Sequence, residues 1–152
     1  HITAAFLKGL SIMMRVLAMD IGDKRIGVAV SDPLGITAQG LETYTRTGDL
    51  DKDTDYLVAL ANKYKPVRLL FGMPRNMDGS YGFASEKVKD FAAAVCAKWD
   101  GEHAFYDERL TTVEAERVLC EAELDWRKRR KVVDKVAAVV ILQGYLATNP
   151  KL

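Results

Sequence analysis

Cysteine, strong net charge and long apolar runs are all scarce in this chain. Cys96 and Cys120 are its only cysteines, and neither has another Cys or His at metal-ligand spacing, which excludes a common type of zinc site. So few cysteines in a domain of this size indicate a reducing compartment, and we expect a cytoplasmic protein. No apolar run approaches the roughly 18 residues of a membrane helix, so no membrane association is expected.

Basic and acidic residues nearly balance, so the net charge indicates neither a nucleic-acid partner nor an acidic one. The 152 residues carry 22 basic and 21 acidic side chains, a net charge of +1, so partners must be inferred from where the charges lie. Residues 1–13 show neither the basic start nor the small-residue cleavage site of a signal peptide. We expect them to be a leader or an artificial extension, and residues 14–152 to form a single domain whose oligomeric state the sequence does not indicate.

The hydrophobic pattern predicts that the domain opens with three strands. They are expected over residues 15–19, 26–30 and 36–44, and the turn residues Gly22-Asp23-Lys24-Arg25 predict an antiparallel hairpin between the first two. Helical periodicity follows over residues 50–64, where the acidic first turn suits a helix N-terminus and is interpreted as structural.

The second half of the chain alternates strands and helices. Strands are predicted over 67–71 and 103–107, separated by a polar loop at 75–80 and a helix marked by Val88, Phe91, Ala92, Val95 and Trp99. A capping box predicts a helix from Thr111 to about residue 123, and a last helix is expected over about 132–147. This order predicts an α/β fold, a mixed five-stranded sheet in βββαβαβα order flanked by helices.

Three carboxylates lie where the apolar pattern gives no reason for a charge. Asp20 closes the first strand on the side of Val16 and Ala18, Glu108 follows the strand at 103–107, and Asp134 lies in the first turn of the last predicted helix. Each also has an ordinary explanation. Asp20 could form the turn, Glu108 could pair with Arg109 or lie in a solvated loop, and Asp134 could be a charge favoured by the helix dipole.

The chemistry of these carboxylates depends on whether they converge. In a mixed sheet, two strand ends and the start of a covering helix can meet at one edge. Two ionised carboxylates at ~4 Å would then repel by about 4 kcal/mol at an effective dielectric constant near 20, so protons or cations would be required. Carboxylate oxygens suit Mg²⁺ or Mn²⁺, and a pair of such ions can cut a phosphodiester.

Basic residues gather in two places. Arg127, Lys128, Arg129, Arg130 and Lys131 precede the last predicted helix, where they oppose its dipole, and Lys24 and Arg25 lie in the first hairpin. A solvated loop would explain the basic run, but we favour phosphate binding. Further candidates for contact with nucleic acid are Arg75, Asn76, Arg109 and Thr111.

Four ordered motifs resemble those of the YqgF (RuvX) family of pre-16S rRNA nucleases, also described as Holliday-junction resolvase-like proteins. They read MRVLAMDIGDKRIGVAVSDPLGITAQ from Met14, LLFGMPRNMDGS from Leu69, DERLTTVEAERVL from Asp107 and KVVDKVAAVVILQGYL from Lys131. The resemblance implies a ribonuclease H-like fold. It departs from the family at Arg75, where an aliphatic residue is usual.

The resemblance also implies roles for the three anomalous carboxylates. Asp20, Glu108 and Asp134 match the family's catalytic acids, which implies that they hold Mg²⁺ or Mn²⁺ and hydrolyse phosphodiesters at the 5′ end of the precursor of small-subunit (16S) ribosomal RNA. Two alternatives stay open: resolution of branched DNA, and a non-catalytic factor that binds nucleic acid during ribosome maturation or transcription.

Overall fold

The fold was described from a computed structural model of the chain, covering residues 15–74, 78, 80–108 and 126–148, with side chains included except at 126–134 and 148. The strands are β1 (Val16–Ile21), β2 (Arg25–Ser31), β3 (Ala38–Thr45), β4 (Arg68–Met73) and β5 (Glu102–Asp107). The helices are α2 (Leu50–Tyr64), α3 (Phe83–Cys96) and α5 (Trp126–Thr148). Among these, no helix combines the length and apolar character needed to span a membrane.

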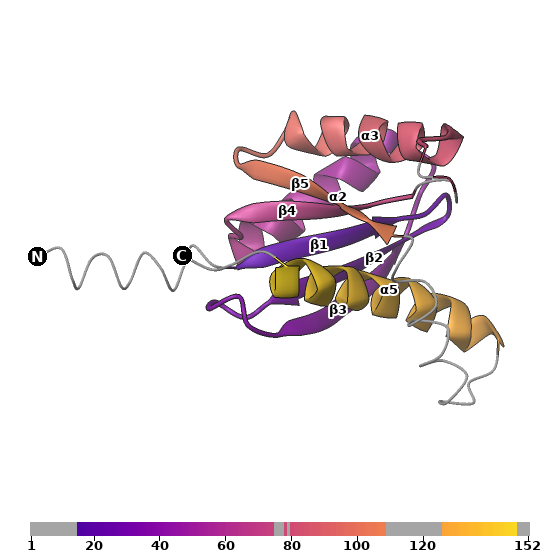
Figure 1. Cartoon of the computed structure of the whole chain (residues 1–152). Coiled ribbons are helices and arrows are strands. Elements are labelled where there is room, and N and C mark those ends of the chain that lie inside the picture. The colour runs from indigo at the N-terminus through magenta and orange to yellow at the C-terminus, as the bar shows by residue number, and fades with distance from the viewer. Residues whose placement is uncertain (1–14, 75–77, 79, 109–125, 149–152) are drawn as a thin grey trace, which may run out of the picture.

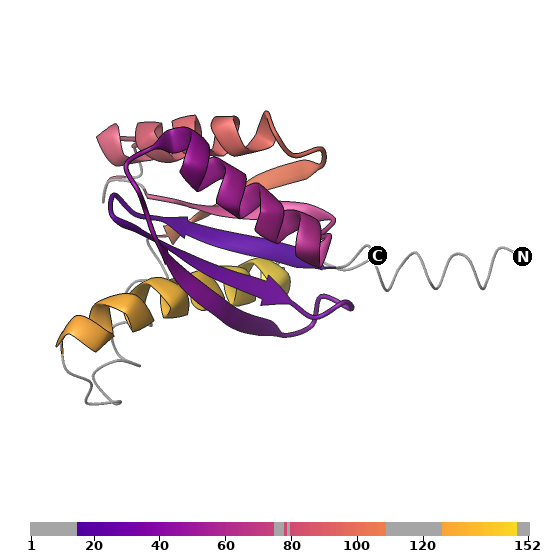
Figure 2. The same ribbon diagram turned by 180° about the vertical axis from the view of Figure 1, so that it is seen from behind.

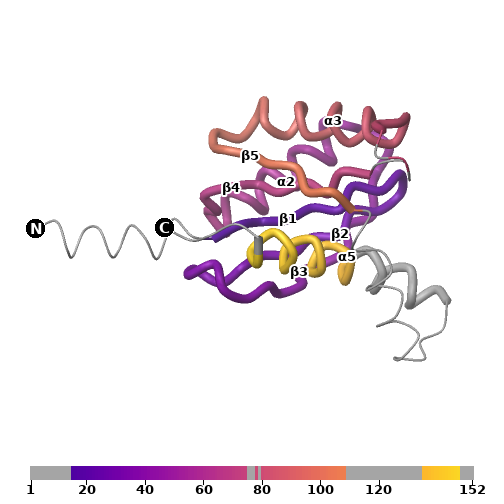
Figure 3. The backbone as a smooth tube through the Cα atoms, viewed as in Figure 1, coloured from indigo at the N-terminus to yellow at the C-terminus, as the bar shows by residue number. Residues whose placement is uncertain are grey.

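The five strands form one mixed sheet in the order β3-β2-β1-β4-β5. The neighbours β1, β2 and β3 pair antiparallel, whereas β4 is parallel to both β1 and β5. The carboxyl ends of β1, β4 and β5 therefore meet at one edge, where sheets of this type commonly place ligands (Figure 3). The predicted α/β fold with a mixed five-stranded sheet, the order of its strands along the chain and the first antiparallel hairpin are confirmed.

Helices cover both faces of the sheet, α5 on one and α2 with α3 on the other (Figures 1 and 2). Leu17 and Met19 alternate with Val16 and Ala18 along β1, so the first pair packs under α2 and α3 and the second pair under α5. Small residues on the α5 face let that helix approach closely. At Gly40, for example, a Cβ atom would lie 2.8 Å from Cγ of Lys135.

Two predicted helix boundaries were wrong. The last helix begins at Trp126, six residues before the predicted start, because arginine and lysine are good helix formers and continue the helix despite the unfavourable dipole. Helix α3 ends at Cys96, so Trp99 lies beyond it, although it is buried in the same core. The predicted helix at 111–123 lies outside the described residues.

Candidate active site

Asp20 lies near the end of the central strand β1, on the face that α5 covers. Its position follows from strand parity, since the buried Val16 and Ala18 precede it on the same face. In the antiparallel pair it lies opposite Gly27, so no neighbouring side chain from β2 covers it. The hairpin turn begins at Gly22, whose amide donates to the carbonyl of Arg25 at 2.9 Å.

Gly22 is needed for this tight turn. A Cβ atom there would lie 2.6 Å from the carbonyl oxygen of Arg25, closer than real Cβ contacts. The turn holds Asp23 and Lys24 out in solvent immediately after the carboxylate of Asp20. Lys24 and Arg25 are both predicted to contact nucleic acid. Arg25 begins β2 two positions from Gly27, the residue opposite Asp20, and Lys24 precedes it in the turn.

Glu108 immediately follows β5 and reaches across the end of β4 to Asp20. The two carboxyl groups share a hydrogen bond, which requires a proton between them. Burial, this hydrogen bond and the negative charges of Asp20 and Asp107 together raise the pKa of Glu108 to about 9. The structure therefore brings together two of the three carboxylates selected from the sequence.

Gly72 of β4 makes room for this pairing. A Cβ atom on Gly72 would lie 2.7 Å from Oε1 of Glu108 and 2.6 Å from Cδ1 of Ile141 in α5. Any larger residue would push the Glu108 carboxyl away from Asp20. We did not identify Gly72 as a site residue from the sequence, where its only signal is a glycine interrupting a buried strand.

The third expected carboxylate, Asp134, belongs to α5, the helix that covers the same face of the sheet. The prediction that it lies in the first turn was wrong: with the helix starting at Trp126, Asp134 is well inside it. Its side chain is not among those described. Among the side chains that are, no group of three His, Cys, Asp or Glu residues is placed to hold a metal ion.

The basic run also belongs to α5 rather than to a loop. Residues 127–131 occupy its first turns, and the structure describes their backbone but not their side chains. The other predicted nucleic-acid contacts lie outside the described residues: Arg75, Asn76, Arg109 and Thr111.

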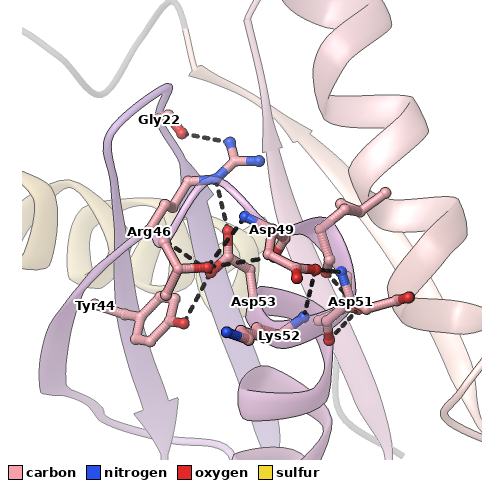
Figure 4. Close-up of polar contacts among 10 residues, drawn as sticks. Gly22, Tyr44, Arg46, Asp49, Asp51, Lys52 and Asp53 are labelled. Carbon is pink, nitrogen blue, oxygen red and sulfur yellow. Dashed lines mark hydrogen bonds and ion pairs between the residues drawn. The ribbon is translucent and has the colours of Figure 1, made fainter.

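A buried ion pair that was not predicted supports the hairpin turn from the α2 side of the sheet (Figure 4). Arg46, just after β3, donates from Nη1 to the carbonyl of Gly22 at 2.9 Å, and its Nε lies 3.5 Å from Oδ2 of Asp53. Asp53 has no solvent exposure. It also accepts hydrogen bonds from Tyr44 Oη at 2.8 Å and from the amide and hydroxyl of Thr47 at 3.0 and 2.9 Å.

These donors determine the ionisation of Asp53. Burial alone would raise its pKa, but the hydrogen bonds from Thr47, Tyr44 and Arg46 outweigh burial and hold the pKa of Asp53 below its usual range. The acidic run at 49–55 is thus structural, as interpreted. However, nothing in its pattern distinguished Asp53 from its exposed neighbours Asp51 and Asp55.

A pocket of about 240 Å³ opens beside the acid pair, between the hairpin turn and the start of α3. Glu108 lines it together with Gly22, Arg46, Phe83 and Lys87. The pocket thus joins the acidic edge of the sheet to two cationic side chains.

The donor set of the acid pair fits a hard divalent cation. Asp20 and Glu108 offer only carboxylate oxygens, which such ions prefer, and in the absence of a cation the pair is held together by a proton. A bound cation would replace that proton and remove the repulsion that raises the pKa of Glu108.

Comparison with known proteins agrees with these observations. A family model described as "RuvX: Holliday junction resolvase" matches residues 14–148. A protein of Halothermothrix orenii named "Putative pre-16S rRNA nuclease" is 49% identical over 139 residues, 91% of this chain and 99% of its own length. A protein of the same name from Clostridium kluyveri is 50% identical over 133 residues, 88% of this chain and 96% of its own length.

The fold resembles that of a solved structure. Thermus thermophilus RuvC, in complex with a Holliday junction substrate, superposes with a TM-score of 0.54 at 14% identity, covering 91% of this chain and 99% of that one. The sheet and its flanking helices thus have the ribonuclease H-like architecture that the resemblance implied. The match over residues 14–148 and the near 50% identity to full-length relatives establish that this chain belongs to the RuvX family.

Proposed function

We propose that this protein is a metal-dependent nuclease that hydrolyses phosphodiesters in structured nucleic acid, and that its substrate is the 5′ end of the small-subunit ribosomal RNA precursor. The pairing of the Asp20 and Glu108 carboxyls at the carboxyl edge of the sheet carries this proposal. Folding does not require two carboxyls there, since the charge of Asp20 raises the cost of ionising Glu108. The names of the relatives favour the ribosomal substrate.

In the proposed mechanism, Asp20, Glu108 and Asp134 would hold two Mg²⁺ or Mn²⁺ ions. When bound, such ions activate the attacking water and stabilise the leaving oxygen. Asp20 is fixed by the register of β1, and the Glu108 carboxyl lies against Gly72, so both carboxyls are positioned before substrate arrives. Lys24 and Arg25 on the hairpin, and the basic run of α5, bind phosphates of the same substrate.

Resolution of branched DNA is the second candidate, because the family description names a Holliday junction resolvase. Both reactions use the same carboxylates and differ in the substrate that the surrounding surface accepts. The cytoplasm, where ribosomal RNA is processed, is the compartment we propose for either.

The decisive experiment compares Asp20→Asn with the parent on two substrates, precursor ribosomal RNA and a four-way DNA junction, each with Mg²⁺ and with Mn²⁺. We expect the parent to cut the RNA and Asp20→Asn to lose at least about a thousandfold in rate, equivalent to about 4 kcal/mol of barrier. Asp90→Asn, an exposed carboxylate of α3, is the matched control and should cut like the parent. A folded Asp20→Asn protein that cuts as fast as the parent would refute the mechanism, and cleavage of the junction alone would establish the second candidate.

A further inference from the structure

The pocket beside the acid pair contains groups that the proposed chemistry does not use. Of its lining residues only Glu108 belongs to the acid pair, whereas Arg46, Lys87 and Phe83 have no role there. Its volume of about 240 Å³ is below the roughly 300–1,000 Å³ of sites that enclose a whole drug-sized ligand. The pocket therefore suits a fragment such as one phosphate with its sugar.

Arg46 presents a fixed guanidinium to this pocket. Asp53 and the carbonyl of Gly22 bind two of its nitrogens, and the ring of Phe91 lies 4.9 Å from Cζ. Its other terminal nitrogen, Nη2, has no hydrogen-bond partner among the described residues, and the side chain retains 23% exposure. A guanidinium held in this way loses little entropy when it binds a phosphate oxygen.

Lys87 supplies a second cation. Its Nζ lies 3.3 Å from Oδ1 of Asp23, but both side chains are at least half exposed, and such ion pairs contribute little stability. A phosphate entering the pocket can therefore replace Asp23 as the partner of Lys87 at little cost.

Phe83 begins α3 with its side chain largely in solvent. It is 77% exposed, the most exposed of the large hydrophobic residues described, and so contributes little to the core. Nζ of Lys87 lies 4.9 Å from the centre of its ring, which places the ring beside the cation at the rim of the pocket. An exposed ring next to a cation is the arrangement with which proteins stack a base of a single strand.

We propose that this pocket binds one nucleotide of the substrate strand adjacent to the scissile phosphate, with its phosphate on Arg46 and Lys87 and its base against Phe83. The proposal rests on the proposed function, since it takes the acid pair as the point of cleavage. The shared residue Glu108 connects the two sites, so a strand that fills the pocket extends directly to the carboxylates.

The chain offers a matched control for this subsite. Nζ of Lys89 lies 4.5 Å from the ring centre of Tyr81, which is 55% exposed, so the same kind of pair occurs beside α3. Neither residue lines the pocket. Phe83→Ala and Lys87→Gln can thus be compared with Tyr81→Ala and Lys89→Gln, all at exposed positions where folding should be retained.

Binding is measured by fluorescence anisotropy in an Asp20→Asn background, which prevents cleavage, with fluorescein-labelled precursor RNA and a labelled four-way DNA junction. We expect Phe83→Ala to weaken binding at least about fivefold, as loss of one stacked base does. Lys87→Gln should lower the slope of log affinity against log salt by about 0.7 to 0.9, the loss of one phosphate contact. The two controls should stay within about twofold of the parent.

Binding by both pocket variants that matches the parent would overturn the proposal, as would equal losses in the controls. Cleavage by the Asp20-containing protein separates this outcome from failure of the proposed function. If that protein cuts the substrate and the pocket variants bind and cut equally well, the subsite is wrong and the nuclease stands. If it cuts neither substrate while Phe83→Ala and Lys87→Gln lose affinity selectively, the binding site stands and the nuclease is wrong.

Discussion

Two carboxyl groups at the same end of the molecule have pKa values displaced in opposite directions. Asp53 is fully buried at the start of α2 and surrounded by hydrogen-bond donors, which hold its pKa below the usual range. Glu108, at the end of β5, has another carboxyl as its hydrogen-bond partner, and its pKa rises to about 9. Burial acts in the same direction on both, so the difference comes from the groups that face them.

The comparison separates a carboxylate that stabilises the fold from a pair of carboxyls that repel each other when both are ionised. Donors from Tyr44, Arg46 and Thr47 satisfy Asp53 within the protein. Glu108 instead faces another carboxyl, that of Asp20, and a proton or a cation between the two would offset their repulsion. An acid whose pKa is raised by a second carboxyl is thus a functional candidate, whereas one surrounded by hydrogen-bond donors is structural.

The largest expected effect is that of Glu108→Gln. We expect cleavage to fall at least about a thousandfold, equivalent to about 4 kcal/mol, because a neutral amide is a poor ligand for a divalent cation. The free energy of unfolding of the metal-free protein should not fall at neutral pH, since the amide can donate to Asp20. Loss of stability comparable to the loss of activity would mean that Glu108 stabilises the fold, as Asp53 does.

The same variant has a signature in pH. A group whose folded pKa is raised binds more protons in the folded than in the unfolded state, so stability falls with rising pH between the two pKa values. For the metal-free protein this window runs from about 4.3, the unfolded value, to about 9. Thermal melts in EDTA should show a lower melting temperature as pH rises through this window, and a smaller decline in Glu108→Gln.

The next effect is that of Asp53→Asn, which should destabilise the protein by about 2–4 kcal/mol. The Asn side chain lacks the negative charge that faces Arg46. Its N–H group would also point at hydrogen-bond donors, which cannot accept from it. The pKa of Asp53 is lowered in the folded state, so its contribution is present above the unfolded value of about 3.9 and is lost as pH falls through the folded value. Urea unfolding at neutral pH and in acid should show the deficit shrinking towards low pH; an equal deficit at both would contradict it.

The sequence pattern selected both members of the acid pair but left open whether they meet. Strand parity places Asp20 on the α5 face, but its meeting with Glu108 depends on the parallel pairing of β4 with β1 and β5, which joins strands far apart in the chain. Gly72 was missed because its role depends on Glu108 and Ile141, which lie far from it in the chain. Arg46 and Asp53 are close in the chain, but their pairing depends on how the chain turns from β3 into α2, which no sequence pattern indicates. The start of α5 was misplaced because helix propensity outweighed the unfavourable dipole of the basic run.

The smallest expected effect tests how closely Glu108 is positioned. In Gly72→Ala the new methyl group would meet Oε1 of Glu108 and Cδ1 of Ile141, so the carboxyl must move away from Asp20. We expect a stability loss of about 1 kcal/mol from overpacking and a fall in kcat of about tenfold, since small displacements of catalytic groups are costly. Gly144→Ala is the control, because its methyl group would meet the ring of Tyr106 under the same helix without touching Glu108. It should lose comparable stability but keep kcat, and an equal fall in kcat would mean that general overpacking, rather than the position of Glu108, limits the reaction.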